Sequence, residues 1–67
     1  MKLSQMVKQR REEKDMTRAE LGRLVNASRE MISYIEDGTK IPSLALTIRL
    51  ANVLGCSLDY LVFGKSA

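Results

Sequence analysis

The segment TRAELGRLVNASREMISYIEDGTKIP, residues 17–42, constrains the fold of this chain more than any other. Thr17 and, three residues later, Glu20 have the spacing of a capping box, which begins a helix. Asn26 is of a residue type that tolerates the left-handed backbone conformation of a sharp turn. Ser28 is then suited to cap a second helix. The segment therefore predicts two short helices separated by a tight turn.

Turn and capping residues divide the rest of the chain in the same way. Gly38 suits the end of the second helix, Pro42 excludes a helix that continues across the next loop, and Ser43 can cap the following helix. We expect five helices, at residues 2–14, 17–26, 28–37, 43–55 and 57–63. Their inward faces should comprise Leu3, Met6, Val7, Leu21, Val25, Met31, Ile32, Ile35, Leu44, Thr47, Ile48, Leu50, Ala51 and Leu54.

The composition agrees with short packed helices. The chain has 67 residues, of which only three are aromatic, and this suits small helices better than a sandwich of sheets. A chain of this length forms one small domain. We therefore predict an all-α fold, a compact arrangement of five helices, in a single domain that covers residues 1–67.

The residue types that the chain lacks exclude several classes of function. It has no histidine and one cysteine, Cys56, so a structural zinc site has too few ligands and nucleophile–histidine catalysis is excluded. The carboxylates are scattered among basic residues, and we expect no enzymatic activity, metal or cofactor. The N-terminal residues are too polar for a signal peptide, and no apolar run is long enough to span a membrane. These features favour a cytoplasmic protein.

The positive charge is concentrated in the first half of the chain. The net charge is +3, and residues 1–30 hold eight basic and five acidic side chains, whereas residues 31–67 hold three of each. An excess of basic residues beside the predicted helix pair is the polarity expected of a protein that binds nucleic acid.

Seven short motifs, at their mutual spacings, resemble those of the phage repressor and Cro-like (Xre-type) family of helix-turn-helix DNA-binding domains over nearly the full chain. In order, the motifs are Arg11-Glu12-Glu13-Lys14, Thr17-x-x-Glu20-Leu21, Asn26-x-Ser28, Ile32-x-x-Ile35-Glu36-x-Gly38, Pro42-Ser43, Leu50-Ala51-x-x-Leu54-Gly55 and Ser57-Leu58-x-x-Leu61. The resemblance implies a lambda-repressor-like fold with its helix-turn-helix at about residues 17–37.

The chain departs from the family pattern at four positions. Gly22 stands where alanine is usual, in the tight contact between the two helices, and Asn26 where glycine is common. Leu24 replaces a typically charged residue, which would leave an apolar spot on the surface, and Thr47 replaces a large aliphatic one. Glycine within a helix lowers its stability by up to about 1 kcal/mol relative to alanine.

The resemblance implies that the helix at 28–37 reads DNA in the major groove. Helical periodicity places Arg29, Glu30, Ser33 and Tyr34 outward if Ile32 and Ile35 face the core. Arg29 can donate two hydrogen bonds to guanine, Glu30 can accept from cytosine, and Tyr34 can contact a thymine methyl group or a phosphate. The alternative is that these four residues form only a solvated polar face.

Phosphate contacts are expected on both sides of this helix. The family pattern implies contacts from Arg18, Ser28, Thr39 and Lys40, with the backbone amides after Gly38, and the N-terminal dipole of the helix at 17–26 assists. Lys8, Arg10 and Arg23 are more distant candidates. Arg11 and Glu36 match an arginine and a glutamate that form a partly buried ion pair in this family, and we assign both to architecture.

The resemblance also implies a two-fold dimer on a palindromic site. Apolar residues at the C-terminal end exceed what closure of one small core requires, and they predict that this end dimerises through the helix 57–63. The expected interface residues are Leu46, Tyr60, Val62 and Phe63. The alternative for Tyr60 and Phe63 is that they cover the edge of the core.

Two functions remain open from the sequence. The first is a sequence-specific transcriptional regulator, of repressor type, that binds double-stranded DNA as a homodimer. The second is a protein-interaction module, such as an antitoxin that masks a partner protein, with DNA binding secondary. Leu24 and the apolar C-terminal helix motivate the second hypothesis.

Overall fold

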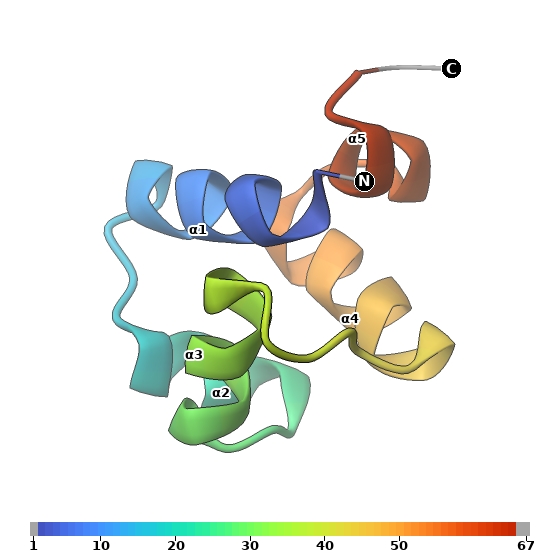
Figure 1. Ribbon diagram of the computed structural model, residues 1–67. Coiled ribbons are helices and arrows are strands. Elements are labelled where there is room, and N and C mark those ends of the chain that lie inside the picture. Colours follow the sequence, from blue (N-terminus) through green and yellow to red (C-terminus); the bar gives the residue numbers. More distant parts are fainter. Residues whose placement is uncertain (1, 66–67) are drawn as a thin grey trace.

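The structure, a computed structural model, describes residues 2–65 and contains five α-helices in that range. The helices are α1 (Leu3–Glu13), α2 (Arg18–Val25), α3 (Arg29–Asp37), α4 (Leu44–Leu54) and α5 (Leu58–Phe63). Helices α2 and α3 lie together below α1, and α5 lies at the opposite end of the molecule (Figure 1). The expected all-α fold is confirmed, and each predicted helix is present to within two residues at either end.

Local capping interactions set the ends of α2 and α3. The Glu20 amide donates to the Thr17 hydroxyl at 3.0 Å, and the Thr17 amide donates to the Glu20 carboxylate at 2.8 Å, which completes the capping box. Asn26 is left-handed with φ 59°, as the turn requires. The Ser28 hydroxyl accepts the Met31 amide at 3.0 Å. Thr17 and Glu20 therefore set the start of α2, and Asn26 and Ser28 set where the turn begins and ends.

The same rules apply to the C-terminal half. Ser43 caps α4 and Ser57 caps α5, and each hydroxyl accepts an amide three residues later, at 3.1 and 3.0 Å. Gly38 and Gly55 adopt positive φ angles of 79° and 71°, where a glycine ends a helix without the steric cost of a side chain.

All five helices contribute to one apolar core. The buried apolar side chains are Leu3, Met6, Val7, Leu21, Val25, Ile32, Ile35, Leu46, Leu50, Ala51, Leu54 and Leu61. Helix α1 crosses this core and contacts α3, α4 and α5, while α2 packs against α3 and α4. The core thus holds α3 by its inner face and leaves its outer face to solvent.

The expected inward face of α4 was wrong at two positions. Leu44 and Ile48 are 72% and 41% exposed, whereas Leu46 is 7% exposed and lies in the core. The helix is rotated so that a stripe through Leu46 and Leu50 faces inward, and Leu44 and Ile48 fall outside that stripe. Thr47 is buried with its hydroxyl donating to the Ser43 carbonyl at 2.8 Å, so its polar atom is satisfied.

No helix in residues 2–65 combines the length and the apolar character that a membrane crossing requires. Within the same range there is also no group of acidic, cysteine or histidine side chains arranged to hold a metal ion.

Gly22 lies within α2, and its α-carbon faces the backbone of the turn into α3. A Cβ atom added to Gly22 would lie 2.7 Å from the Ala27 carbonyl oxygen and 3.3 Å from the Ser28 carbonyl carbon. The Ala27 amide also donates to the Gly22 carbonyl at 2.8 Å, which holds the two segments together. The alanine usual in the resembling family therefore does not fit this backbone without displacing the turn.

We expect Gly22→Ala to destabilise the protein. Overpacking costs about 1–3 kcal/mol, which outweighs the gain of up to about 1 kcal/mol in helix propensity. Ala19→Gly, at an exposed position of the same helix, is the control for propensity alone and should cost about 1 kcal/mol. Urea unfolding measures both changes. A Gly22→Ala protein more stable than the wild type would refute the close packing.

The capping box should also make stability depend on pH. The pKa of Glu20 is lowered, first by the hydrogen bond from the Thr17 amide and then by the Thr17 hydroxyl and by Arg23. Because the folded-state pKa is depressed, the stabilisation is present above the ordinary pKa of about 4.3 and is lost as the pH falls through the folded value.

Glu20→Gln keeps the geometry of a capping box but does not titrate. We expect the wild type to be the more stable protein at neutral pH, and the difference to shrink as the pH falls from about 5 to about 3. Urea unfolding at a series of pH values measures this. A difference that is constant over that range would show that the Glu20 charge does not contribute.

Candidate nucleic-acid interface

The outer face of α3 carries the residues that the sequence predicted would read DNA. Arg29 and Glu30 are exposed in the first turn, and Tyr34, one turn later, is 41% exposed. Ile32 and Ile35 point into the core from the other side of the helix. The structure therefore brings Arg29, Glu30 and Tyr34 onto a single solvent-facing surface.

The C-terminal end of α3 is held by an ion pair with α1. The Glu36 side chain is fully buried, and its carboxylate accepts from Arg11 Nε at 2.6 Å and from Arg11 Nη2 at 3.1 Å. Arg11 Nη1 donates to the Met16 carbonyl at 2.7 Å. The bidentate hydrogen bond to Glu36 raises the pKa of Arg11 above its ordinary value, which outweighs the opposing effect of burial. This is the pair that the family resemblance implied.

A second guanidinium shares the same carboxylate. Arg18 Nε donates to Glu36 Oε1 at 3.1 Å, and Arg18 Nη1 lies 3.5 Å from the Ser33 hydroxyl. We refer to these three side chains as the Arg11–Glu36–Arg18 cluster, and Glu12 Oε2 lies 4.0 Å from Arg11 Nη2 on its other side. The Arg18 side chain is 33% exposed, so its guanidinium lies near the surface beside α3.

The surroundings of Arg18 and Ser33 differ from those expected from the sequence. Arg18 was expected only to contact phosphate, and in the structure it also ties the start of α2 to α3. Ser33 was expected to face a base, and it is instead half-buried beside the Arg18 guanidinium. Sequence reasoning missed this link because Arg18 and Glu36 are far apart in the chain and share no local pattern.

The loop after α3 is bound back onto that helix. The amides of Thr39 and Lys40 both donate to the Tyr34 carbonyl, at 2.9 and 3.2 Å. The expectation that these amides are available to a phosphate was therefore wrong, because the end of the helix already uses them. The side chains of Thr39 and Lys40 are exposed, and Lys40 Nζ lies 4.8 Å from the centre of the Tyr34 ring. Ser28 is exposed at the other end of α3, and its hydroxyl hydrogen remains available to a phosphate.

Two arginines support the scaffold in ways that the sequence did not indicate. Arg49 Nε donates to the Val25 carbonyl at 2.8 Å, at the end of α2. Arg10 Nη2 donates to the Leu54 and Gly55 carbonyls at 3.1 and 3.4 Å, at the end of α4. Cationic side chains at helix C-termini are favourable. Arg10, a distant candidate for phosphate contact, is therefore engaged within the protein.

The residues expected at a dimer interface do not form one surface. The prediction that Leu46 belongs to the interface was wrong, because the rotation of α4 places Leu46 in the core. Tyr60 and Val62 are half-buried, and Phe63 is 58% exposed. Leu24 is 55% exposed on α2, the apolar surface spot expected from the sequence.

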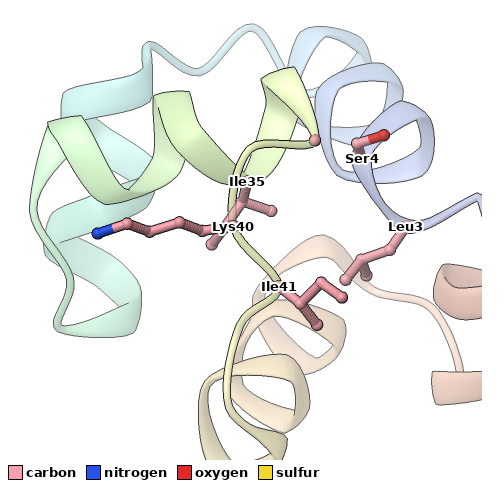
Figure 2. Close-up of a pocket in the computed structure, with 6 residues that line it drawn as sticks. Leu3, Ser4, Ile35, Lys40 and Ile41 are labelled. Carbon is pink, nitrogen blue, oxygen red and sulfur yellow. The ribbon is translucent and has the colours of Figure 1, made fainter.

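A small hollow of about 180 Å³ lies between the start of α1 and the loop after α3 (Figure 2). Its lining residues are Leu3, Ser4, Ile35, Gly38, Lys40 and Ile41. The charged end of Lys40 points away from the hollow, along α3. The hydroxyl of Ser4 and the ammonium group of Lys40 are therefore not brought together in it.

We expect Glu36→Gln to be strongly destabilising, because it leaves two guanidiniums beside a neutral amide. Breaking a buried ion pair typically costs about 3–5 kcal/mol. Glu13→Gln is the matched control, since Glu13 is half-exposed and pairs with Arg10 at 3.0 Å, and an exposed pair is worth about 1 kcal/mol or less. Urea unfolding in the cold, where the variant retains more structure, measures both. Equal losses in the two variants would show that the cluster contributes no more than a surface pair.

Comparison with known proteins agrees with this geometry. A protein-family model described as helix-turn-helix matches residues 7–61, and no curated protein sequence matches the chain. A crystal structure of the P22 c2 repressor in complex with a synthetic operator superimposes with a TM-score of 0.91 at 30% identity, covering 94% of this chain and 96% of that one. The solution structure of the DNA-binding domain of the P22 c2 repressor gives 0.88 at 31% identity, covering 92% and 82%. The chain therefore belongs to the helix-turn-helix family.

Proposed function

We propose that this chain is a sequence-specific transcriptional regulator of repressor type, which binds double-stranded DNA with α3 in the major groove. The observation that carries the proposal is the similarity, over 94% of the chain, to a repressor in complex with its operator. The orientation of α3 supports it, because Arg29, Glu30 and Tyr34 are exposed on the outer face while Ile32 and Ile35 are buried on the other side.

Base reading is assigned to the first turns of α3. Arg29 can donate to guanine O6 and N7, and Glu30 can accept from the amino group of cytosine. Tyr34 lies one turn further on, where its ring can contact a thymine methyl group. Ser33 is the weakest of the four, since it is half-buried beside Arg18 and would act on DNA through that guanidinium.

Phosphate binding is assigned to the two flanks of α3. Arg18 contributes from the start of α2, where its partly exposed guanidinium can attract an anion. Ser28 contributes at the start of α3, and Thr39 and Lys40 contribute with their side chains from the loop beyond it. Such contacts set orientation and affinity, and the outer face of α3 supplies the sequence preference.

The proposal includes a homodimer on a palindromic operator with half-sites about 34 Å apart. Phe63 is the exposed apolar residue of α5, and Tyr60 and Val62 beside it are only half-buried. These three residues form the proposed interface, without Leu46. As a DNA-binding regulator the protein would act in the cytoplasm, without a cofactor or an enzymatic activity of its own.

The antitoxin hypothesis has no support from the comparisons. Both similar structures are of a repressor, one of them in complex with an operator. Two features motivated the hypothesis, namely Leu24 and the apolar C-terminal helix. Leu24 is one exposed apolar residue of α2, and single exposed apolar residues are common on protein surfaces. On α5, the exposed Phe63 is assigned to the proposed dimer interface.

Selection of bound sites from random double-stranded DNA tests the proposed function. We expect enrichment of two-fold symmetric sites, with binding that weakens steeply as the salt concentration rises. Retention of all sequences equally would contradict sequence-specific recognition. Enrichment of unpaired half-sites would contradict the dimer while leaving the DNA-binding role intact.

Arg29→Ala should reduce binding to the selected site far more than binding to a scrambled duplex. Loss of a bidentate contact with guanine is worth about 1–3 kcal/mol of discrimination, or roughly 5- to 150-fold in affinity. Arg23→Ala removes one exposed arginine from α2 and is the control for charge alone. Fluorescence anisotropy on both duplexes measures the ratio. An equal loss on the two duplexes would assign Arg29 to the phosphate backbone instead.

A further inference from the structure

We propose that Lys40 is a positioning residue for Tyr34, so that the loop after α3 takes part in base recognition as well as in phosphate binding. This inference rests on the proposed function, and it adds a residue that determines specificity. It follows from three features of the structure, namely the attachment of the loop, the direction of the Lys40 side chain and the contact between its ammonium group and the aromatic ring.

The loop is attached to α3 at the residue whose side chain it would position. The Thr39 and Lys40 amides share the Tyr34 carbonyl, at 2.9 and 3.2 Å, and the Gly38 amide donates to the Ile35 carbonyl at 3.1 Å. Gly38 has a φ of 79°, which turns the chain back over the helix. The backbone of Lys40 is thereby held next to Tyr34, although six positions separate them in the sequence.

The Lys40 side chain runs along α3. Lys40 lies at the edge of the hollow with Leu3, Ile35 and Ile41, and its side chain extends away from Leu3 and Ile41 (Figure 2). In this direction its ammonium group reaches the Tyr34 ring.

The ammonium group occupies one face of the ring. Lys40 Nζ lies 4.8 Å from the centre of the Tyr34 ring, within the range of a cation–π interaction. Tyr34 remains 41% exposed, so part of the residue is accessible to a base pair. An ammonium group has three donors, and Lys40 can therefore bind a phosphate while it holds the ring.

The two possible roles of Lys40 differ in whether it changes the affinity for all sequences or the preference at particular base pairs. A lysine that binds only phosphate changes affinity for all sequences alike. A lysine that also fixes the Tyr34 ring changes the preference at the base pairs that Tyr34 contacts, and at no others. The two roles are separated by base-preference profiles rather than by affinity alone.

The test compares profiles selected from random double-stranded DNA by the wild type, Tyr34→Ala, Lys40→Met, Lys40→Arg and the double variant Tyr34→Ala/Lys40→Met. Methionine keeps an unbranched apolar side chain and removes the charge, while arginine keeps the charge. Lys14→Met, at an exposed position at the end of α1, is the control for loss of one positive charge.

We expect Lys40→Met to weaken the preference about two- to fivefold at the base pairs that Tyr34→Ala flattens, the range of an exposed cation–π contact. Lys40→Arg should retain the preference, Lys14→Met should leave the profile unchanged, and Lys40→Met should add no further change to the profile of Tyr34→Ala. A uniform loss of affinity with an unchanged profile would overturn the positioning role, as would a Tyr34→Ala protein with the wild-type profile.

A measurement without DNA keeps the inference separate from the proposed function. The ring current of Tyr34 should shift the ε-methylene protons of Lys40 upfield in the NMR spectrum, and Tyr34→Leu should remove the shift. Absence of the shift in the wild type would overturn the contact itself. If the shift is present and the wild type enriches no DNA sequence, the proposed function fails, and the specificity role of Lys40 fails with it.

Discussion

The rest of the structure depends on the ion pairs that the buried carboxylate of Glu36 forms with two arginines. The carboxylate accepts hydrogen bonds from Arg11 on α1 and from Arg18 on α2, so one side chain of α3 joins three helices. A carboxylate without solvent carries a large desolvation cost, and two guanidiniums in direct contact offset it. Because the three groups must keep these distances, the outer face of α3 is held at a fixed angle to the start of α2. The same arrangement places the partly exposed Arg18 guanidinium at the surface where we propose that a phosphate binds.

The turn between α2 and α3 supplies the second constraint. Gly22 permits the Ala27 carbonyl to approach closer than a Cβ atom would allow, and Asn26 adopts the left-handed conformation that reverses the chain. Arg49 on α4 donates a hydrogen bond to the Val25 carbonyl at the end of α2. A short helix such as α3 gains little stability by itself, and its position is set by these contacts and by the burial of Ile32 and Ile35.

Features that depend on neighbouring residues could be predicted from the sequence, and features that depend on helix rotation could not. The capping box at Thr17, the left-handed Asn26 and the glycine at position 38 follow from rules that act within four residues. The exposure of Arg29, Glu30 and Tyr34 follows from helical periodicity. The burial of Leu46 and the exposure of Leu44 depend on how α4 is rotated against the core, which its apolar residues on several sides do not determine. Three further hydrogen-bonded contacts join Arg18 to Glu36, Arg10 to the end of α4 and Arg49 to the end of α2. Their partners are 18 to 45 positions apart, and no sequence pattern links them.

The central claim is that α3, held by Glu36, is the surface that binds DNA. The most direct measurement is a titration of the isotopically labelled protein with a duplex obtained by selection, followed by the NMR shifts of its backbone amides. The claim predicts the largest changes in the first turns of α3, at the start of α2 and in the loop at residues 39–40. Changes confined to α5 or to the outer stripe of α4 at Leu44 and Ile48, with α3 unaffected, would contradict it.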